Sequence, residues 1–237
     1  MKLVLLITGT LAVLQSTAQS TTQLVSADGR MIGDVGNING AVITTIHPKD
    51  IEGKPNLGSD WNYGTVYFKK GKRADSLLLH FDIAENKIYF KQNDVPLSFL
   101  EEVAAFWLYP SEEIKKKDLL FRSGYPATGQ HNMNSFYEVM ADEGPLHLLK
   151  YRSMIITESY VYNAPARRKY IPHDDLYLFI PQSSIIQKIK MNKKSLEKQL
   201  PEYAGTIESL CEKNKWELKT EAEVVELVKE LNSRFAK

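Results

Sequence analysis

Alternation of apolar and polar residues between positions 64 and 91 constrains the fold of this chain more than any other feature. In the middle of this segment, Leu77, Leu79, Phe81 and Ile83 fall on one face of an extended strand. Polar turns at 70–73 and 85–86 interrupt the alternation. A period of two residues with short polar turns is typical of antiparallel strands that bury one face. The segment therefore predicts an antiparallel meander.

Further strands are predicted where β-branched and aromatic residues gather between turn-forming residues. These strands cover 41–46, 102–109, 135–141, 146–151, 153–162, 175–180 and 184–190. Residues 110–134 are expected to form a long irregular connection, and the polar stretch 163–174 is expected to separate two strands. Most of the chain up to about residue 190 is therefore predicted to be β-structure.

The hydrophobic period changes from strand-like to helical after about residue 192. Pro201 suits the first turn of a helix. Thr220 followed by Glu223 forms a capping box, in which each side chain bonds to the other residue's backbone amide. Strands first and helices last predict a mainly β or α+β fold, an antiparallel meander sheet or partial barrel with two to three C-terminal helices packed on it. One β-rich domain is expected over 41–237, ending in a helical segment over 192–237.

The N-terminus carries the features of a secretory signal peptide. Lys2 precedes an apolar run from Leu3 to Leu14, which is shorter than the roughly 20 residues of a membrane-spanning helix. The small residues Ser16 and Ala18 predict cleavage after Ala18. The interpretation is a signal peptide over 1–18 and a flexible lead-in over 19–40, in a protein exported to the periplasm or the extracellular space.

One cysteine and a near-neutral charge exclude several classes of protein. Cys211 is the only cysteine, so the chain has neither an intramolecular disulfide nor an N-terminal cysteine for lipid attachment. The 30 Lys and Arg residues nearly balance 29 Asp and Glu residues, which argues against a nucleic-acid partner. A second apolar stretch of membrane length is absent from the sequence, so an integral membrane protein is not expected.

A resemblance appears in the segment Leu57–Val66, which reads LGSDWNYGTV, and in the hairpin that follows it. With Asn86–Phe90, Val103–Phe106 and the C-terminal pattern from Leu196 to Asn232, it resembles a W-x-x-G-x-V hairpin module with C-terminal helices. Such modules are similar to those of uncharacterised secreted or periplasmic β-rich proteins of Bacteroidota-type Gram-negative bacteria. The resemblance covers about half of the mature chain and implies no functional residues.

Histidines and carboxylates suggest two candidate chemical sites. His173, Asp174 and Asp175 are consecutive polar residues before a predicted strand, but adjacent side chains seldom converge on one metal ion, so a solvated turn is the preferred interpretation. His80 and Asp82 share the polar face of a predicted strand, as a hydrogen-bonded pair on an exposed or cleft-lining surface. Neither group predicts a catalytic residue or a metal ligand.

Two further motifs are better explained structurally. Ser195 and Lys198 imitate the serine–lysine pair of penicillin-recognising enzymes, but the companion motifs of those enzymes are missing. Cys211 lies on an apolar helix face, where a buried hydrophobic role outweighs that of a nucleophile. No catalytic residue, metal ligand or cofactor is predicted.

Aromatic residues supply the candidate ligand-binding positions. Tyr160 and Tyr162 share one strand face, and Tyr177 and Phe179 share another. If these faces line a concave sheet, they can hold an apolar or flat ligand. The alternative is that these residues pack beneath the C-terminal helices.

Together these features favour an exported, non-enzymatic binding or interaction module of the bacterial cell envelope. The expected partners are an envelope protein or an apolar small ligand, and dimerisation through an exposed edge strand stays open. The alternative is a periplasmic hydrolase whose site is assembled from His and carboxylate residues distant in sequence.

Overall fold

The computed structural model describes residues 38–43, 50–109, 117–160, 162–163 and 165–235. The predicted signal peptide over 1–18 and most of the predicted lead-in over 19–40 lie outside these ranges. At the end of the lead-in, Ile38 is buried in the hydrophobic core and Gly40 begins the first strand.

The alternating segment forms the predicted antiparallel meander. Its strands are β3 (Asn62–Phe68), β4 (Arg73–Asp82), β5 (Lys87–Gln92) and β6 (Val95–Phe99). Gly71 and Asn86 lie in the intervening turns with positive φ angles of 83° and 53°, a backbone region that glycine and asparagine tolerate best. Local turn chemistry and the period-two pattern thus specify the same structure.

The meander belongs to one open sheet of twelve strands in the order β1-β6-β5-β4-β3-β7-β8-β9-β10-β11-β12, with β2 beside β11. The other strands are β1 (Gly40–Val42), β2 (Ile51–Glu52), β7 (Val103–Leu108), β8 (Leu119–Arg122), β9 (Tyr137–Ala141), β10 (His147–Ser159), β11 (Arg167–Ile180) and β12 (Ile185–Ile189). Within the described ranges, every pair is antiparallel except β2 with β11. The predicted mainly β or α+β fold is confirmed.

Three α-helices follow the last strand. They are α1 (Lys193–Gln199), α2 (Ala204–Asn214) and α3 (Glu221–Phe235), with a 3₁₀ turn at Pro201–Tyr203. The capping box of α3 is confirmed, because the Glu223 amide donates to Thr220 Oγ1 at 3.3 Å and the Thr220 amide donates to Glu223 Oε2 at 3.4 Å. Within the described ranges, none of the helices is long and apolar enough to cross a membrane.

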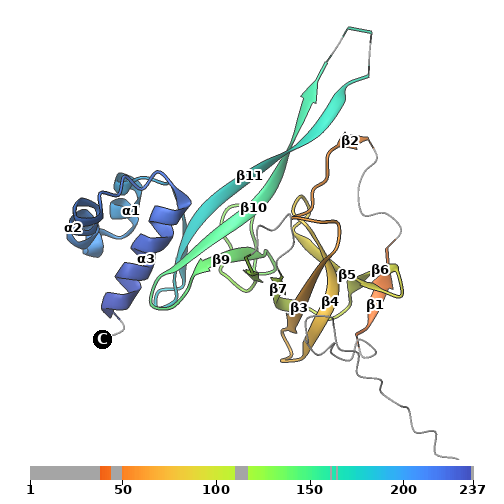
Figure 1. The fold of residues 1–237 in the computed structure, drawn as a ribbon, viewed down its shortest axis with the longest axis horizontal. Helices are drawn as coiled ribbons and strands as arrows, with labels where there is room; N and C mark the ends of the chain where they lie inside the picture. The colour runs from red at the N-terminus through yellow and green to blue at the C-terminus, as the bar shows by residue number, and fades with distance from the viewer. Residues whose placement is uncertain (1–37, 44–49, 110–116, 161, 164, 236–237) are drawn as a thin grey trace, which may run out of the picture.

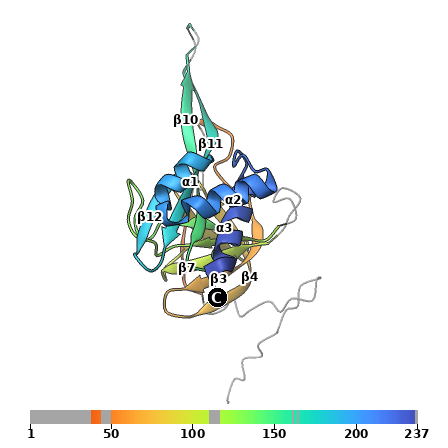
Figure 2. The same ribbon diagram turned by 90° about the vertical axis from the view of Figure 1, so that its left-hand side faces the viewer.

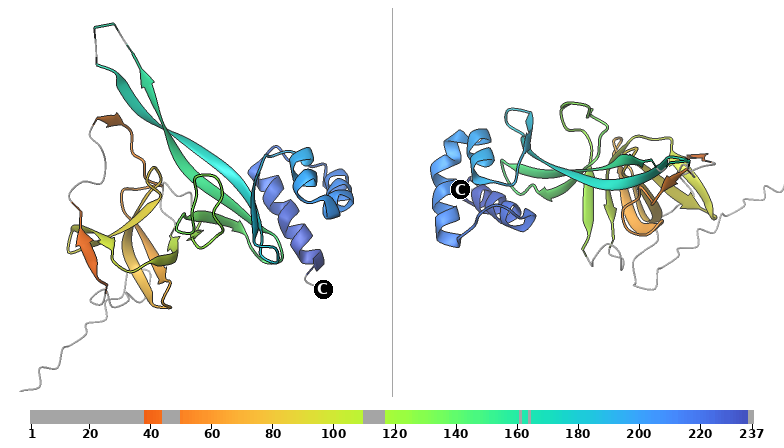
Figure 3. Two further views of the ribbon diagram at one scale, coloured as in Figure 1. Left: turned by 180° about the vertical axis from the view of Figure 1, so that it is seen from behind. Right: turned by 90° about the horizontal axis from the view of Figure 1, so that it is seen from above.

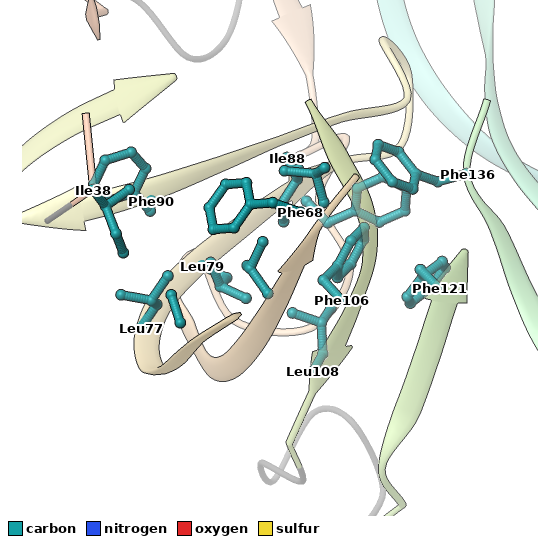
Figure 4. Packing of buried hydrophobic residues seen from close by; sticks show 14 of the residues in the cluster. Ile38, Phe68, Leu77, Leu79, Ile88, Phe90, Phe106, Leu108, Phe121 and Phe136 are labelled. Carbon is teal, nitrogen blue, oxygen red and sulfur yellow. The ribbon is translucent and has the colours of Figure 1, made fainter. Parts of the chain in front are cut away.

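Two of the three hydrophobic clusters in the described residues lie at opposite ends of the molecule, among the N-terminal strands and at the C-terminal helices (Figures 1 and 3). The first lies among the N-terminal strands, where Phe106 stacks on Phe121 (Figure 4) and Phe81 is tilted against both rings. The second joins the base of β10 and β11 to one face of the helices, with Leu148 and Leu227 fully buried. The long sheet connects the two cores.

Three boundary predictions are wrong in the middle of the chain. The stretch 110–134 contains β8, which pairs with β7 and β9. The strands predicted at 146–151 and 153–162 are one continuous strand, β10. Residues 167–174, predicted to be a connection, form the first half of β11, because pairing with β10 extends that strand despite its polar composition and Pro172.

The N-terminal strand is also shorter in the described residues than predicted. The sequence predicts a strand over 41–46, whereas β1 ends at Val42. Residues 44–46 lie outside the described ranges.

Candidate functional site: the β10–β11 arm

The β10–β11 hairpin extends well beyond the rest of the sheet. Its register runs without interruption from His147 opposite Phe179 to Ser159 opposite Arg167. β9 pairs with β10 only as far as Lys150, and β12 pairs with β11 only from Leu176 onward. Beyond these points the two long strands form a ribbon that projects from the molecule, as Figures 1 and 3 show, and among the described strands only the two-residue β2 pairs with it. We call the part of the hairpin from Tyr151 to Asp175 the arm.

Large apolar side chains are exposed along the arm. Ile155 and Ile171 are opposite each other in the register and are 48% and 40% exposed. Ile156, on the other face, is also exposed. A two-stranded hairpin is marginally stable by itself, and soluble proteins seldom leave neighbouring apolar side chains in water without a binding role. The arm is therefore the leading candidate for an interaction surface.

The tip of the arm carries two exposed tyrosines. Tyr160 and Tyr162 are 76% and 93% exposed. The Tyr160 hydroxyl donates to Glu158 at 2.7 Å, and this hydrogen bond raises the pKa of the tyrosine. Tyrosine combines a large apolar ring with a polar hydroxyl and is enriched where proteins meet. Two of the four predicted ligand-binding residues thus lie on a projecting tip.

A short N-terminal strand braces the arm. β2 runs parallel to β11, with Ile51 beside Arg168 and Glu52 beside Lys169. Arg168 also forms an ion pair with Asp50 at 2.7 Å. The brace links the arm to the N-terminal half of the chain and covers part of the outer edge of β11.

The other two predicted ligand-binding residues lie at the base of the hairpin, far along β11 from the tip. Tyr177 is buried in an aromatic cluster with Tyr137 and Leu149. Phe179 is half-buried against the same cluster, with its ring 5.1 Å from that of Tyr125. The structure therefore separates the four predicted residues into an exposed tip pair and a packed base pair. This cluster is distinct from the core beneath the helices.

The aromatic cluster also contains a histidine that the sequence did not single out. The His131 ring stacks on Tyr151 with 3.7 Å between ring centroids, and its Nδ1 lies 2.7 Å from the Tyr137 hydroxyl. Burial lowers the pKa of His131, so the neutral imidazole is favoured near neutral pH. Because His131 lies in a stretch without periodicity, only tertiary contacts reveal its neighbours.

A pocket of about 510 Å³ adjoins the base of the arm. Tyr151 of β10 forms one wall, and Tyr89, Phe99 and Phe136 supply further aromatic surface. The Asn86 side chain fixes one side, because it donates to the Phe136 carbonyl at 3.0 Å and accepts from the Phe136 amide at 2.7 Å. The volume lies within the range of small-molecule sites in proteins.

The His80–Asp82 pair is not exposed, contrary to the prediction. Both side chains are buried, because the chain before β3 continues the sheet beside the end of β4. His80 Nδ1 lies 2.6 Å from the Asp60 carbonyl oxygen, and the His80 ring faces Trp61. Asp82 accepts a hydrogen bond from the Glu85 amide at 2.9 Å. Both residues therefore support the local backbone.

The structure gives His173 and Asp175 an extended backbone. The predicted solvated turn at 173–175 is wrong, because these residues lie within β11. His173 Nε2 is 3.4 Å from Asp175, which also pairs with Lys188 at 2.7 Å. Throughout the described part of the chain, no group of three His, Cys, Asp or Glu residues is arranged to hold a metal ion.

The other two motifs have structural roles. Ser195 Oγ accepts from the Lys190 amide at 3.0 Å, and the Ser195 amide donates to Asn192 at the start of α1. Cys211 is buried in the helical core, and burial raises the pKa of its thiol. Both observations agree with the structural interpretation preferred from the sequence.

Comparison with known proteins adds no family. No family model matches the chain, and no curated protein and no solved structure matches it either. The resemblance to secreted β-rich proteins of Bacteroidota-type bacteria therefore stays a prediction, and the functional argument depends on the geometry of the arm.

Proposed function

We propose that this chain is an exported, non-enzymatic interaction module of the bacterial cell envelope, and that it docks to a partner protein through the tip of the β10–β11 arm. The observation that carries the proposal is the exposure of Tyr160 and Tyr162 on a braced, projecting ribbon. Packing the two rings against a partner would remove apolar surface from water, which is the main favourable term in protein association.

The chemistry of the tip indicates the kind of partner surface. Arg167 begins β11 opposite Ser159, next to the ion-paired Arg168 and Lys169. Tyrosine and arginine are over-represented among the residues that dominate binding energy. An apolar groove bordered by carboxylates would complement both the rings and the positive charge.

Site-specific photo-crosslinking tests this proposal in the native compartment. A benzophenone amino acid replaces Tyr162 in one strain and Tyr63 in another, because Tyr63 is an exposed tyrosine on β3, away from the arm. The expected result is a discrete adduct from position 162 that position 63 does not give. Mass spectrometry identifies the partner, which is then purified.

Affinity measurements with the identified partner complete the test. Tyr162→Ala is expected to weaken binding about thirtyfold or more, because truncating an interface hot spot costs about 2 kcal/mol or more and about 1.4 kcal/mol corresponds to a factor of ten. The matched variant Tyr63→Ala should leave affinity unchanged. Equal adducts from both positions, or equal affinities of both variants, would overturn the proposal.

Export is tested separately by the intact mass of the protein recovered from the periplasm or medium. Cleavage after Ala18 gives a mature chain that starts at Gln19. A full-length mass in the cytoplasm would contradict export without bearing on the arm.

The aromatic pocket favours a second candidate function, the binding of an apolar small ligand. Its volume of about 510 Å³ and the rings of Tyr89, Phe99, Phe136 and Tyr151 are suited to such a molecule, and the polar residues that make up most of the remaining lining would bond to its polar groups. Native mass spectrometry of the protein purified from its own compartment would show an added mass that disappears on denaturation. Bare protein would argue against a carried ligand. The hydrolase alternative stays a prediction, without an observation in its favour.

A further inference from the structure

The outer edge of β10 within the arm is an open template for another strand. Beyond Lys150, no described strand pairs with this edge, although Tyr151–Ser159 continues as regular β-structure. The open segment has a length of about 30 Å, at about 3.4 Å per residue. Its unpaired backbone groups can bond to an added strand, the usual route of edge-to-edge association.

The two edges of the arm differ in how well they are protected against pairing with another strand. On β11, Pro172 lacks an amide hydrogen and β2 covers the edge at Arg168 and Lys169. The open segment of β10 contains neither proline nor lysine, the two residues that commonly protect edge strands. Proximally, Tyr151 stacks on His131, whereas the distal half of β10 projects from the molecule with no described strand on its outer edge (Figures 1 and 2).

The open segment is chemically self-complementary. In a two-fold dimer of antiparallel strands, residue i lies opposite residue j when their numbers have a constant, even sum. With the axis at Ile155, the opposed residues from the centre outward are Ile155 with Ile155, Met154 with Ile156, Ser153 with Thr157, Arg152 with Glu158 and Tyr151 with Ser159. Apolar residues thus face apolar residues, hydroxyls face hydroxyls and opposite charges face each other.

Shifting the two-fold axis by one residue along β10 removes this match between opposed side chains. An axis at Ile156 places Met154 opposite Glu158, and an axis at Met154 places Arg152 opposite Ile156. Opposed strand pairs of matching chemistry stabilise a sheet, whereas mismatched pairs do not. The charged residues already have partners within one chain, since Arg152 binds Glu138 at 2.6 Å and Glu158 binds Arg168 at 3.2 Å. The added contact between Arg152 and Glu158 therefore fixes the register more than it adds affinity.

We infer that two copies of this chain associate through the β10 edges of their arms, with the two-fold axis at Ile155. The two ribbons then form a four-stranded sheet that covers the edges and brings the exposed isoleucines of both copies together. This inference rests on the proposed role of the arm as the docking element.

Disulfide trapping of the mature chain tests the register. Ile155→Cys places two thiols directly opposite each other, where Cβ atoms lie about 4.5–5.5 Å apart and Cα separation suits a disulfide. Ile171→Cys is the matched control, because Ile171 occupies the same rung with similar exposure. In the dimer its two copies are separated by three strand spacings, about 14 Å. The native Cys211 is buried in both variants.

The expected result is rapid formation of a covalent dimer by Ile155→Cys and none by Ile171→Cys. Sedimentation equilibrium of the unmodified mature chain should show a reversible monomer–dimer equilibrium. Ile155→Lys opposes two like charges at the axis and should raise the dimer dissociation constant about tenfold or more, whereas Ile171→Lys should change it much less. Both substitutions replace exposed side chains, so folding should persist.

Equal crosslinking of the two cysteine variants, or a monomer at all accessible concentrations, would overturn the inference. If the chain is monomeric but Tyr162→Ala still weakens the identified partner's binding, the dimer fails and the proposed function stands. If the Ile155→Cys dimer forms but no partner depends on Tyr162, the arm is a dimerisation element and the proposed docking function fails.

Discussion

The carboxamide of Asn232 is one of the links that hold α3 to the sheet, and Asn232→Ala is expected to lower the free energy of unfolding by about 2–4 kcal/mol. Asn232 Nδ2 donates to the Leu146 carbonyl at 2.8 Å, and Oδ1 accepts from the Leu146 amide at 3.0 Å. Both residues are buried, Asn232 on α3 and Leu146 immediately before β10. The side chain therefore satisfies both backbone groups of Leu146, as a neighbouring strand would.

The size of this loss follows from the two backbone groups, the Leu146 amide and carbonyl, that the substitution leaves without a hydrogen-bond partner. A buried amide or carbonyl that loses its partner costs about 1–3 kcal/mol. Two such groups would cost about 2–6 kcal/mol, and relaxation or an entering water molecule reduces that range to its lower half. A loss of this size is a large fraction of the roughly 5–15 kcal/mol that stabilises a typical domain.

Equilibrium unfolding in urea, followed by tryptophan fluorescence, measures this loss. Trp216 packs against the helical core and reports on the region that Asn232 fastens. Asn214→Ala is the matched control, because Asn214 lies on α2 and donates only to the Leu210 carbonyl of its own helix. The control should change stability by less than about 0.5 kcal/mol, as surface substitutions usually do. A loss below that limit for Asn232→Ala, or equal losses for the two variants, would refute the reasoning.

Two further predictions concern close packing and pH. Gly64→Ala should destabilise the fold by about 3 kcal/mol, because the added Cβ would lie 2.1 Å from the Trp107 carbonyl oxygen. Gly205→Ala lies on a helix with free space around it and should stabilise the fold by up to about 1 kcal/mol. The urea unfolding midpoint should fall in the first variant and rise in the second, and equal shifts would contradict this pair of predictions. Burial lowers the pKa values of His131 and His147 below the unfolded value near 6.5, so the unfolded chain binds protons more readily. The stability that the two neutral histidines contribute is present above about pH 6.5 and is lost as pH falls through their folded pKa values. The urea unfolding midpoint should therefore fall between neutral and acidic pH, and it should fall less in His131→Gln than in the unmodified chain. Equal decreases in the two proteins would contradict the assignment to His131.

Local pattern was sufficient to predict the hairpins from β3 to β5 and the start of α3. In both regions the residues that specify the element are its own neighbours, namely the alternating side chains around Leu79 and the reciprocal bonds of Thr220 and Glu223. Such signals depend little on the rest of the fold.

Long-range pairing decided the features that sequence reasoning missed. β8 has four residues and exists because β7 and β9 lie on either side of it. The first half of β11 contains Arg167, Lys169 and Pro172, which a strand pattern disfavours, yet it is extended by its register with β10. Pattern reasoning sees only composition at such positions, since the stabilising partners are distant in sequence.

The candidate site shows the same division. The two aromatic pairs, Tyr160 with Tyr162 and Tyr177 with Phe179, were visible in the sequence, but alternation cannot tell a strand in a core from a strand in a projecting ribbon. Tyr160 and Tyr177 belong to the same hairpin, and their opposite environments follow from where β9 and β12 stop pairing with it.

The sequence by itself determined the β-rich class, the antiparallel meander and the C-terminal helices, because short-range periodicity and capping encode these features. Only the tertiary structure decided which faces are covered. It buried His80 and Asp82, packed Tyr177 and left Tyr162 in water. Burial depends on which distant segments meet, so the arm and its open edge emerge only once the whole sheet is assembled.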